Sequence, residues 1–257
     1  MHPRSLKDFL DAKAVQYNHS DFIQYDPILI PHSYQRRQDI EISGFLTALL
    51  AWGQRKVIIR KCKEFLGMMD HAPHDFVLHH QPNDLKPLCN FKHRTFNATD
   101  AHYVIHFLQF YYQQHDTLED AFLQGISPQD ISTENGIIHF HHLFFSLPDC
   151  PERTRKHIAT PERQSACKRI NMFLRWMVRK DHQGVDFGLW QRIQPCQLIC
   201  PCDVHVSRVA RKLGLIQRKN TDWKAAIELT NNLSALCHVD PVKYDFALFG
   251  LGAMEEF

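Results

Sequence analysis

Glycine is scarce in this sequence, and so are the long apolar runs that mark membrane helices. The chain has 257 residues and only 10 glycines, and it contains no phosphate loop of the GxGxxG or GxxxxGK[ST] type. No apolar stretch reaches the roughly 18 residues that a transmembrane helix needs. The N-terminal segment MHPRSLKDFLDAK also lacks an apolar core, so we expect no secretory signal and a cytoplasmic protein.

The composition excludes a disordered or disulfide-stapled chain. Hydrophobic residues make up 44% and charged residues 23%, which is enough apolar material for one large folded unit. The 8 cysteines come without a secretory signal, so we expect them to be reduced thiols. The 18 histidines are mostly scattered, so we interpret them first as composition.

Apolar residues recur at helical spacing along most of the chain, and no alternating pattern is long enough to predict a sheet. The fold class that this predicts is all-α. Residues 147–163, with three prolines, are the expected linker or crossover. The expected helices are 42–52, 55–69, 100–114, 116–124, 163–180, 204–213, 222–236 and one that begins after Asp240.

Capping residues locate several helix ends. An acidic side chain at a helix start can accept hydrogen bonds from free backbone N–H groups, and glycine commonly follows a helix end. The predicted caps are Asp116 with Glu119, Asp203 with Gly214, and Asp240 and Pro241 with Gly252.

Positive charge is concentrated in one third of the chain. Residues 153–224 hold 16 Lys and Arg against 5 Asp and Glu, although the whole chain has a net charge of only +2. On the helix expected at 163–180, Lys168, Met172, Arg175 and Arg179 share a stripe nearly opposite the apolar one. This pattern favours a polyanionic partner, with a solvated basic face as the alternative.

The segment CPCDVHVSRVARKLG resembles the Asp-x-His-[VI]-x-Arg-Val segment of helix-hairpin-helix DNA glycosylases such as endonuclease III. In that family the Asp activates the attacking nucleophile and stabilises the cationic sugar. Asp203 matches that position, and His205 and Arg208 follow in register. A carboxylate at a helix N-terminus stays ionised, and an ionised carboxylate is what an oxocarbenium-like transition state requires. The alternative is that Asp203 is only a helix cap.

Two further segments are similar to the same family. FLTALLAWGQRKVIIRKCKEFL matches its helix–Gln–helix segment, whose Gln fills the space left by the target base, and Gln54 takes that position. DPVKYDFALFGLG is like the closing helix of the same lobe. The resemblance implies one two-lobed unit over 1–257, with lobes at 30–150 and at 1–29 plus 151–257. The run SACKRINMFLRWMVRKD also resembles an uncharacterised bacterial family.

The glycine-rich hairpin of the glycosylases is missing. Between the long helix and Asp203 the only glycines are Gly184 and Gly188, so the sequence lacks the family's usual phosphate anchor. A branch without that hairpin, the archaeal 8-oxoguanine glycosylases, has its nucleophilic Lys at the start of an upstream helix. KRINMFLRWMV is similar to that arrangement, which makes Lys168 the candidate nucleophile, with cations such as Arg169 lowering its pKa.

The function implied is base excision from double-stranded DNA by a monomer that needs no cofactor. Asp203 and Lys168 would be catalytic, and a damaged base would be flipped into a cleft between the lobes. Trp176 and Trp190 are the candidates for stacking on that base. The residues expected to contact DNA are Gln54, Arg169, Arg175, Arg179, His205, Arg208 and Arg211.

Two other classes of function stay open. The missing hairpin favours a nucleic-acid-binding protein that kept the scaffold and lost the chemistry. An all-α metal phosphohydrolase would use His–Asp pairs, here His74–Asp75 and His115–Asp116. Zinc on Cys196, Cys200, Cys202 and His205 is disfavoured, because that spacing fits no common site.

Overall fold

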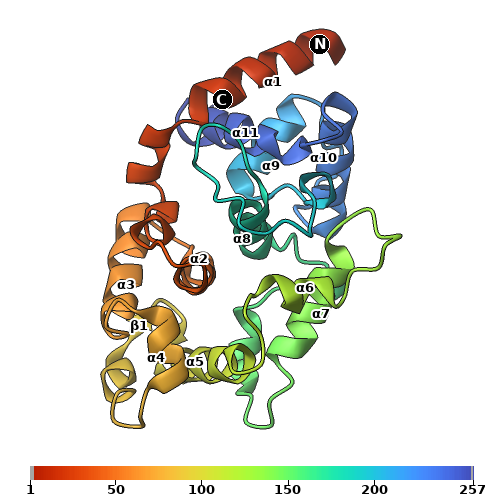
Figure 1. Ribbon diagram of the computed structural model, residues 1–257. Coiled ribbons are helices and arrows are strands. Elements are labelled where there is room, and N and C mark those ends of the chain that lie inside the picture. The colour runs from red at the N-terminus through yellow and green to blue at the C-terminus, as the bar shows by residue number, and fades with distance from the viewer. Residues whose placement is uncertain (1–2, 256) are drawn as a thin grey trace.

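The computed structural model describes residues 3–255 and 257, and it confirms the all-α class (Figure 1). The helices expected from periodicity are present, and most of their boundaries lie within a few residues of those expected, whereas the helices at 3–17, 73–79 and 134–144 were not expected. The helices are α1 (Pro3–Tyr17), α2 (Arg37–Leu50), α3 (Arg55–Gly67), α4 (Pro73–His79), α5 (Ala98–Tyr112), α6 (Glu119–Leu123), α7 (Glu134–Phe144), α8 (Lys168–Val178), α9 (Val204–Lys212), α10 (Trp223–Leu236) and α11 (Tyr244–Ala253).

The strands that the structure describes form one small hairpin. β1 (Lys92–His93) pairs antiparallel with β2 (Phe96–Asn97), with Lys92 opposite Asn97. Short 3-10 turns fill much of the remaining chain, among them η6 (Pro161–Arg163) and η8 (Pro241–Lys243). Among the described residues, no helix has both the length and the apolar character needed to cross a membrane.

Helix α2 lies at the centre of the molecule. In Figure 1, α3 lies beside it, α4 to α7 lie below it, and α1 and α8 to α11 lie above it. Every residue of α2 from Ile40 to Leu50 is buried. Its Phe45 ring contacts Phe140 and Phe144 of α7 and also Phe173 of α8. The core therefore continues from one group of helices to the other through α2.

The N- and C-terminal helices pack together. Helix α1 lies against α11 at the top of Figure 1. Gly250 of α11 faces the ring of Tyr17, and a Cβ atom at Gly250 would lie 2.2 Å from Tyr17 Cδ2. A side chain does not fit there, so this glycine is required by close packing.

Three sequence-based boundaries are wrong in detail. Helix α8 begins at Lys168, because Cys167 before it adopts a left-handed conformation with φ 49°. Helix α6 begins after Leu118, and no side chain caps it, so Asp116 is not a capping residue. Gly252 lies inside α11, because that helix continues to Ala253.

A buried carboxylate explains the position of Trp190. Glu41 of α2 is fully buried, and its oxygens accept hydrogen bonds from Trp190 Nε1 at 2.8 Å, Tyr112 Oη at 2.8 Å and Thr117 Oγ1 at 2.6 Å. A buried charge that is satisfied in this way anchors the elements around it. The prediction that Trp190 stacks on a base is therefore wrong, since its ring belongs to the core.

Candidate functional site

A cavity of about 180 Å³ lies where the α2–α3 turn approaches the N-terminal ends of α8 and α9 and the side of α11. Five of the residues singled out from the sequence line it. They are Lys168, Arg175, Trp176, Asp203 and His205. The chain brings these residues together from α8 and from the start of α9, which the sequence alone could not demonstrate.

Asp203 is both a helix cap and a cavity-lining carboxylate. Its Oδ1 accepts hydrogen bonds from the backbone N–H groups of His205 and Val206, each at 2.9 Å, which confirms the predicted cap. Its Oδ2 lies 3.8 Å from Nζ of Lys168. The capping bonds fix the orientation of the carboxylate, and the second oxygen is left to face the lysine and the cavity.

Lys168 is the first residue of α8, so its backbone lies at the positive end of that helix. Its side chain is 29% exposed and that of Asp203 is 23% exposed, so the pair is partly shielded but reachable from solvent. At 3.8 Å the amine and the carboxylate form an ion pair, and the proton transfer that a lysine nucleophile requires needs a closer approach of the two groups.

The deep side of the cavity contains two carboxylates that the sequence analysis missed. Asp26 and Asp245 line it and are both buried. Burial raises the pKa of Asp26, and it raises the pKa of Asp245 to about 6, although neighbouring Arg175 acts in the opposite direction. A signal was available for each, since Asp26 precedes Pro27 at a turn and Asp245 lies in the third segment that matches the glycosylases.

Apolar side chains form the remaining walls. Trp176 is fully buried, lines the cavity, and has no hydrogen-bond partner for its Nε1. Phe22 and Phe249, which are distant from Trp176 in the sequence, also line the cavity. The Arg55 guanidinium lies 4.8 Å from the centre of the Phe249 ring. A cavity of roughly 150 Å³ holds benzene, so this one has room for a single planar ring.

Arg175 and Arg179 do not face solvent, and the prediction that they contact phosphates is wrong. Their side chains are only 6% and 4% exposed. Asp186 lies between them, 3.2 Å from Nε of Arg175 and 3.0 Å from Nη1 of Arg179. Asp245 pairs with Arg175, and Asp240 pairs with Arg179. The anionic partner of this stripe is therefore a set of internal carboxylates.

Arg169 stabilises the turn between α2 and α3. Its guanidinium donates hydrogen bonds to the carbonyl oxygens of Leu49 at 2.5 Å and His157 at 2.9 Å. It also lies 4.6 Å from the ring centre of Trp52, and the imidazole of His157 stacks on the same ring at 5.5 Å. Burial lowers the pKa of Arg169 to about 10. Two of its donors are used inside the protein, and its predicted contact with DNA stays a prediction.

Gln54 lies at the edge of the cavity. Gly53 before it lines the cavity with φ 104°, a backbone conformation that favours glycine, and Arg55 after it lines the cavity as well. Gln54 itself is exposed, and its side chain makes no capping bond to α3. It is therefore available to an external ligand, and its predicted contact with DNA stays a prediction.

The remaining predicted DNA contacts lie along α9. His205 is exposed at the cavity. Arg208 is exposed and donates a hydrogen bond to the Gly252 carbonyl at 2.7 Å. Arg211 donates to the Arg218 carbonyl at 2.8 Å and to Thr221 Oγ1 at 3.1 Å, so it holds the loop that follows α9. Of this group, His205 and Arg208 stay candidates for DNA contact, whereas Arg211 has a structural task.

Asp100 anchors the segment on which Trp52 and Arg169 pack. Its side chain is fully buried, and it accepts hydrogen bonds from Asn97 N at 2.9 Å and Thr154 Oγ1 at 2.8 Å. Arg153 pairs with it, and His157 Nε2 lies 3.3 Å away. Burial by itself would raise the pKa of Asp100, but the bonds from His157, Asn97 and Thr154 outweigh it and lower the pKa to about 2.

We expect acid to remove this anchor. Because the pKa of Asp100 is lower in the folded state than the usual 3.8, its stabilisation is present above about pH 4 and is lost as the pH falls through about 2. Asp100→Asn should therefore be less stable near pH 7, and its free energy of unfolding should fall less steeply between about pH 4 and pH 2. Urea unfolding across that range measures the slope, with the exposed Asp75→Asn as control. Equal slopes for Asp100→Asn and the parent chain would contradict the assignment.

The side chains that the metal-dependent alternatives would use as ligands have other surroundings in the structure. His115 stacks on Tyr111, and Asp75 lies 3.5 Å from the Arg36 guanidinium. Neither His–Asp pair belongs to a cluster of possible metal ligands in the described part of the chain. Cys202 is buried, and burial raises the pKa of its thiol to about 12, which disfavours the thiolate that zinc needs.

Comparison with known families places the chain but assigns no activity. A family described as a protein of unknown function (DUF2400) matches residues 26–254. The match covers most of the chain, so the protein belongs to this family. No curated protein and no solved structure matches it significantly.

Proposed function

We propose that this DUF2400 member is a DNA glycosylase with lyase activity that removes a flipped, damaged base from double-stranded DNA. The observation that carries the proposal is the pairing of Lys168 with Asp203, 3.8 Å apart, in a cavity of about 180 Å³. The protein would act in the cytoplasm as a monomer, and it would need no cofactor.

The chemistry follows from the two side chains. Asp203 accepts a proton from Lys168, and the neutral amine attacks C1′ of the damaged nucleotide. A C–N bond to Nζ forms while the bond from C1′ to the base breaks, and its electron pair leaves with the base. The base takes up the proton that Asp203 held, so Asp203 becomes a charged carboxylate again. The C1′–O4′ bond then breaks, O4′ takes up a proton given up by Nζ, and a Schiff base forms between C1′ and Lys168. The Asp203 carboxylate also stabilises positive charge on the sugar in the transition state.

Several features support a base as the ligand. The cavity has room for one planar ring and has aromatic walls, which suits stacking. Exposed Gln54 follows a cavity-lining residue, so it is placed to fill the vacated position in the duplex. Lys168 and Arg55 add positive charge at the cavity, which favours the phosphates that flank a flipped nucleotide.

One observation favours the non-catalytic alternative. The segment between α8 and α9 contains one short 3-10 turn, Pro195–Gln197, and no helical hairpin that would hold phosphates by backbone N–H groups. A scaffold that binds nucleic acid without cleaving it would tolerate that loss. The two functions differ in whether Lys168 forms a covalent bond.

Borohydride trapping tests the proposed function directly. A duplex with an abasic site should form a covalent adduct with the parent chain, because borohydride reduces the Schiff base to a stable amine. Lys168→Gln should abolish the adduct. Lys180→Gln is the matched control, since Lys180 is the other lysine just upstream of Asp203 and is exposed, and it should leave trapping unchanged.

The same experiment extends to duplexes that carry an oxidised, deaminated or alkylated base, one of which should be cleaved by the parent chain. An adduct that persists in Lys168→Gln would assign the nucleophile elsewhere. Salt-sensitive duplex binding with neither an adduct nor excision of any of these bases would support the non-catalytic alternative.

A further inference from the structure

We propose that His141, His142 and Glu162 form a binding site for a divalent transition-metal ion of the zinc type. The site is separate from the cavity of Lys168 and Asp203, because none of its residues lines that cavity. It goes beyond the proposed glycosylase function and does not depend on it.

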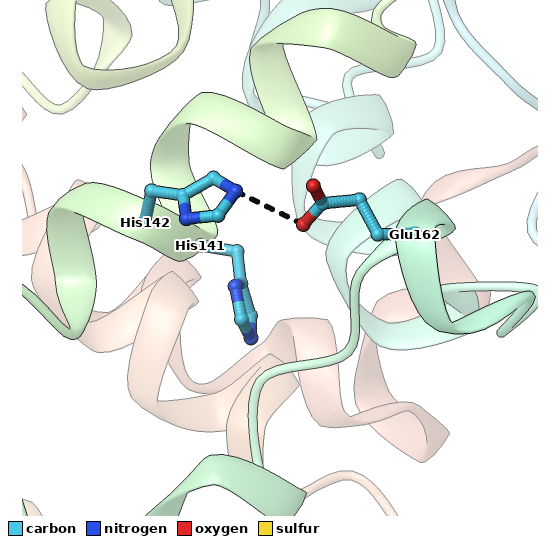
Figure 2. A group of neighbouring side chains, drawn as sticks. All are labelled: His141, His142 and Glu162. Atoms are coloured by element: carbon cyan, nitrogen blue, oxygen red, sulfur yellow. Dashed lines mark ion pairs between the residues drawn. The ribbon is translucent and has the colours of Figure 1, made fainter.

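The three side chains come from two elements that are distant in sequence. His141 and His142 lie in the last turns of α7, and Glu162 lies in the 3-10 turn η6 that leads toward α8. One ligand atom from each residue lies within 4.8 Å of the other two. His142 Nε2 is 3.0 Å from Glu162 Oε2, and Figure 2 shows these two side chains pointing at each other with the His141 ring beside them.

His141 supplies an independent observation. Its side chain is buried, with only 4% exposed, and neither of its ring nitrogens has a hydrogen-bond partner. A buried polar group that lacks a partner destabilises the folded state, so native proteins rarely leave one. Coordination of an ion by one nitrogen would remove that cost. Because the ring lies next to a second imidazole and a carboxylate, a metal ion is the partner that suits it.

The ligand types select the ion. Imidazole nitrogen suits zinc, copper, iron and nickel, whereas magnesium and calcium prefer sites made of oxygen. Two imidazoles with one carboxylate form a set of three protein ligands that zinc accepts, with a further position open to water. Glu162 and His142 are 45% and 63% exposed, so an ion can enter from solvent.

The location indicates a structural effect. Thr160 caps η6 by accepting a hydrogen bond from the Glu162 backbone N–H, and only residues 164–167 separate the end of η6 from Lys168 at the start of α8. An ion held by α7 and η6 would tie these elements together and restrain the segment that precedes Lys168. Binding should therefore raise the thermal stability of the full chain by mass action.

The test uses the tag-free full chain after treatment with a chelator. Calorimetric titration with Zn²⁺ should show one ion per chain, and the unfolding temperature should rise with Zn²⁺ but not with Mg²⁺ or Ca²⁺. Glu162→Gln and His142→Asn each remove one exposed ligand, so both variants should fold, and their affinity for Zn²⁺ should be lower by roughly a hundredfold. His106→Gln, an exposed histidine on α5, is the control that should bind like the parent.

Three outcomes would overturn the proposal. These are no saturable binding of Zn²⁺ by the parent chain, equal affinity in the parent and in both ligand variants, and equal shifts of the unfolding temperature by Mg²⁺ and Zn²⁺. None of these readouts involves DNA or the Lys168 adduct, so failure here is distinct from failure of the proposed glycosylase function.

Discussion

Asp203→Asn is expected to remain folded and to slow base excision by roughly a hundredfold or more. The amide oxygen of Asn can still accept the hydrogen bonds from His205 N and Val206 N, so the helix cap survives with a loss of a few tenths of a kcal/mol at most. Asn carries no negative charge, so it can neither take the proton of Lys168 nor stabilise a cationic sugar. Single-turnover excision kinetics and urea unfolding measure the two effects separately.

A second variant and a matched control complete this experiment. Asp203→Ala removes the cap as well as the charge and should also lose about 1 kcal/mol of stability. Asp222 caps α10 in the same way, accepting a hydrogen bond from Ala225 N at 2.9 Å, but it does not line the cavity. Asp222→Asn should therefore leave excision unchanged. Full activity in Asp203→Asn would mean that Asp203 is a cap and that the active site lies elsewhere.

Local signals allowed the correct prediction of the features that depend on neighbours in sequence. Periodicity located most of the helices, although it did not predict α1, α4 and α7. The capping role of Asp203 follows from an acidic residue directly before an amphipathic helix. The pairing of Lys168 with Asp203 came from the family resemblance, and the structure places both in one cavity. Short-range rules work in these cases because helix formation and capping are decided within a few residues.

Charges that are neutralised across long sequence distances could not be predicted in this way. The stripe of Arg175 and Arg179 looks solvent-exposed on a helical wheel, because a wheel shows two faces but not what packs on them. Asp186 and Asp240, which bury this stripe, come from a loop and from the start of η8. For the same reason, the proximity of Glu162 to His142 is invisible in the sequence.

The burial of Arg175 leads to the largest expected change in stability. Arg175→Met keeps the apolar stem of the side chain, but it leaves Asp245 without its cation and leaves Asp186 paired with Arg179 alone. Breaking a buried ion pair by removing one partner typically costs about 3–5 kcal/mol, because the remaining charge stays buried. The guanidinium also stacks 4.4 Å from the Phe246 ring centre, and this contact is lost too.

Urea unfolding of Arg175→Met against Arg208→Met tests this explanation. Arg208 is exposed and donates one hydrogen bond to the Gly252 carbonyl, so its replacement should cost no more than about 1 kcal/mol. An arginine that served to contact phosphates would give the opposite pattern, with stability kept and salt-dependent DNA binding weakened. A loss below about 1 kcal/mol in Arg175→Met would show that the carboxylates are satisfied without it. The two buried arginines would then have to be reconsidered as ligand contacts, because the buried charge network is the reason for excluding them.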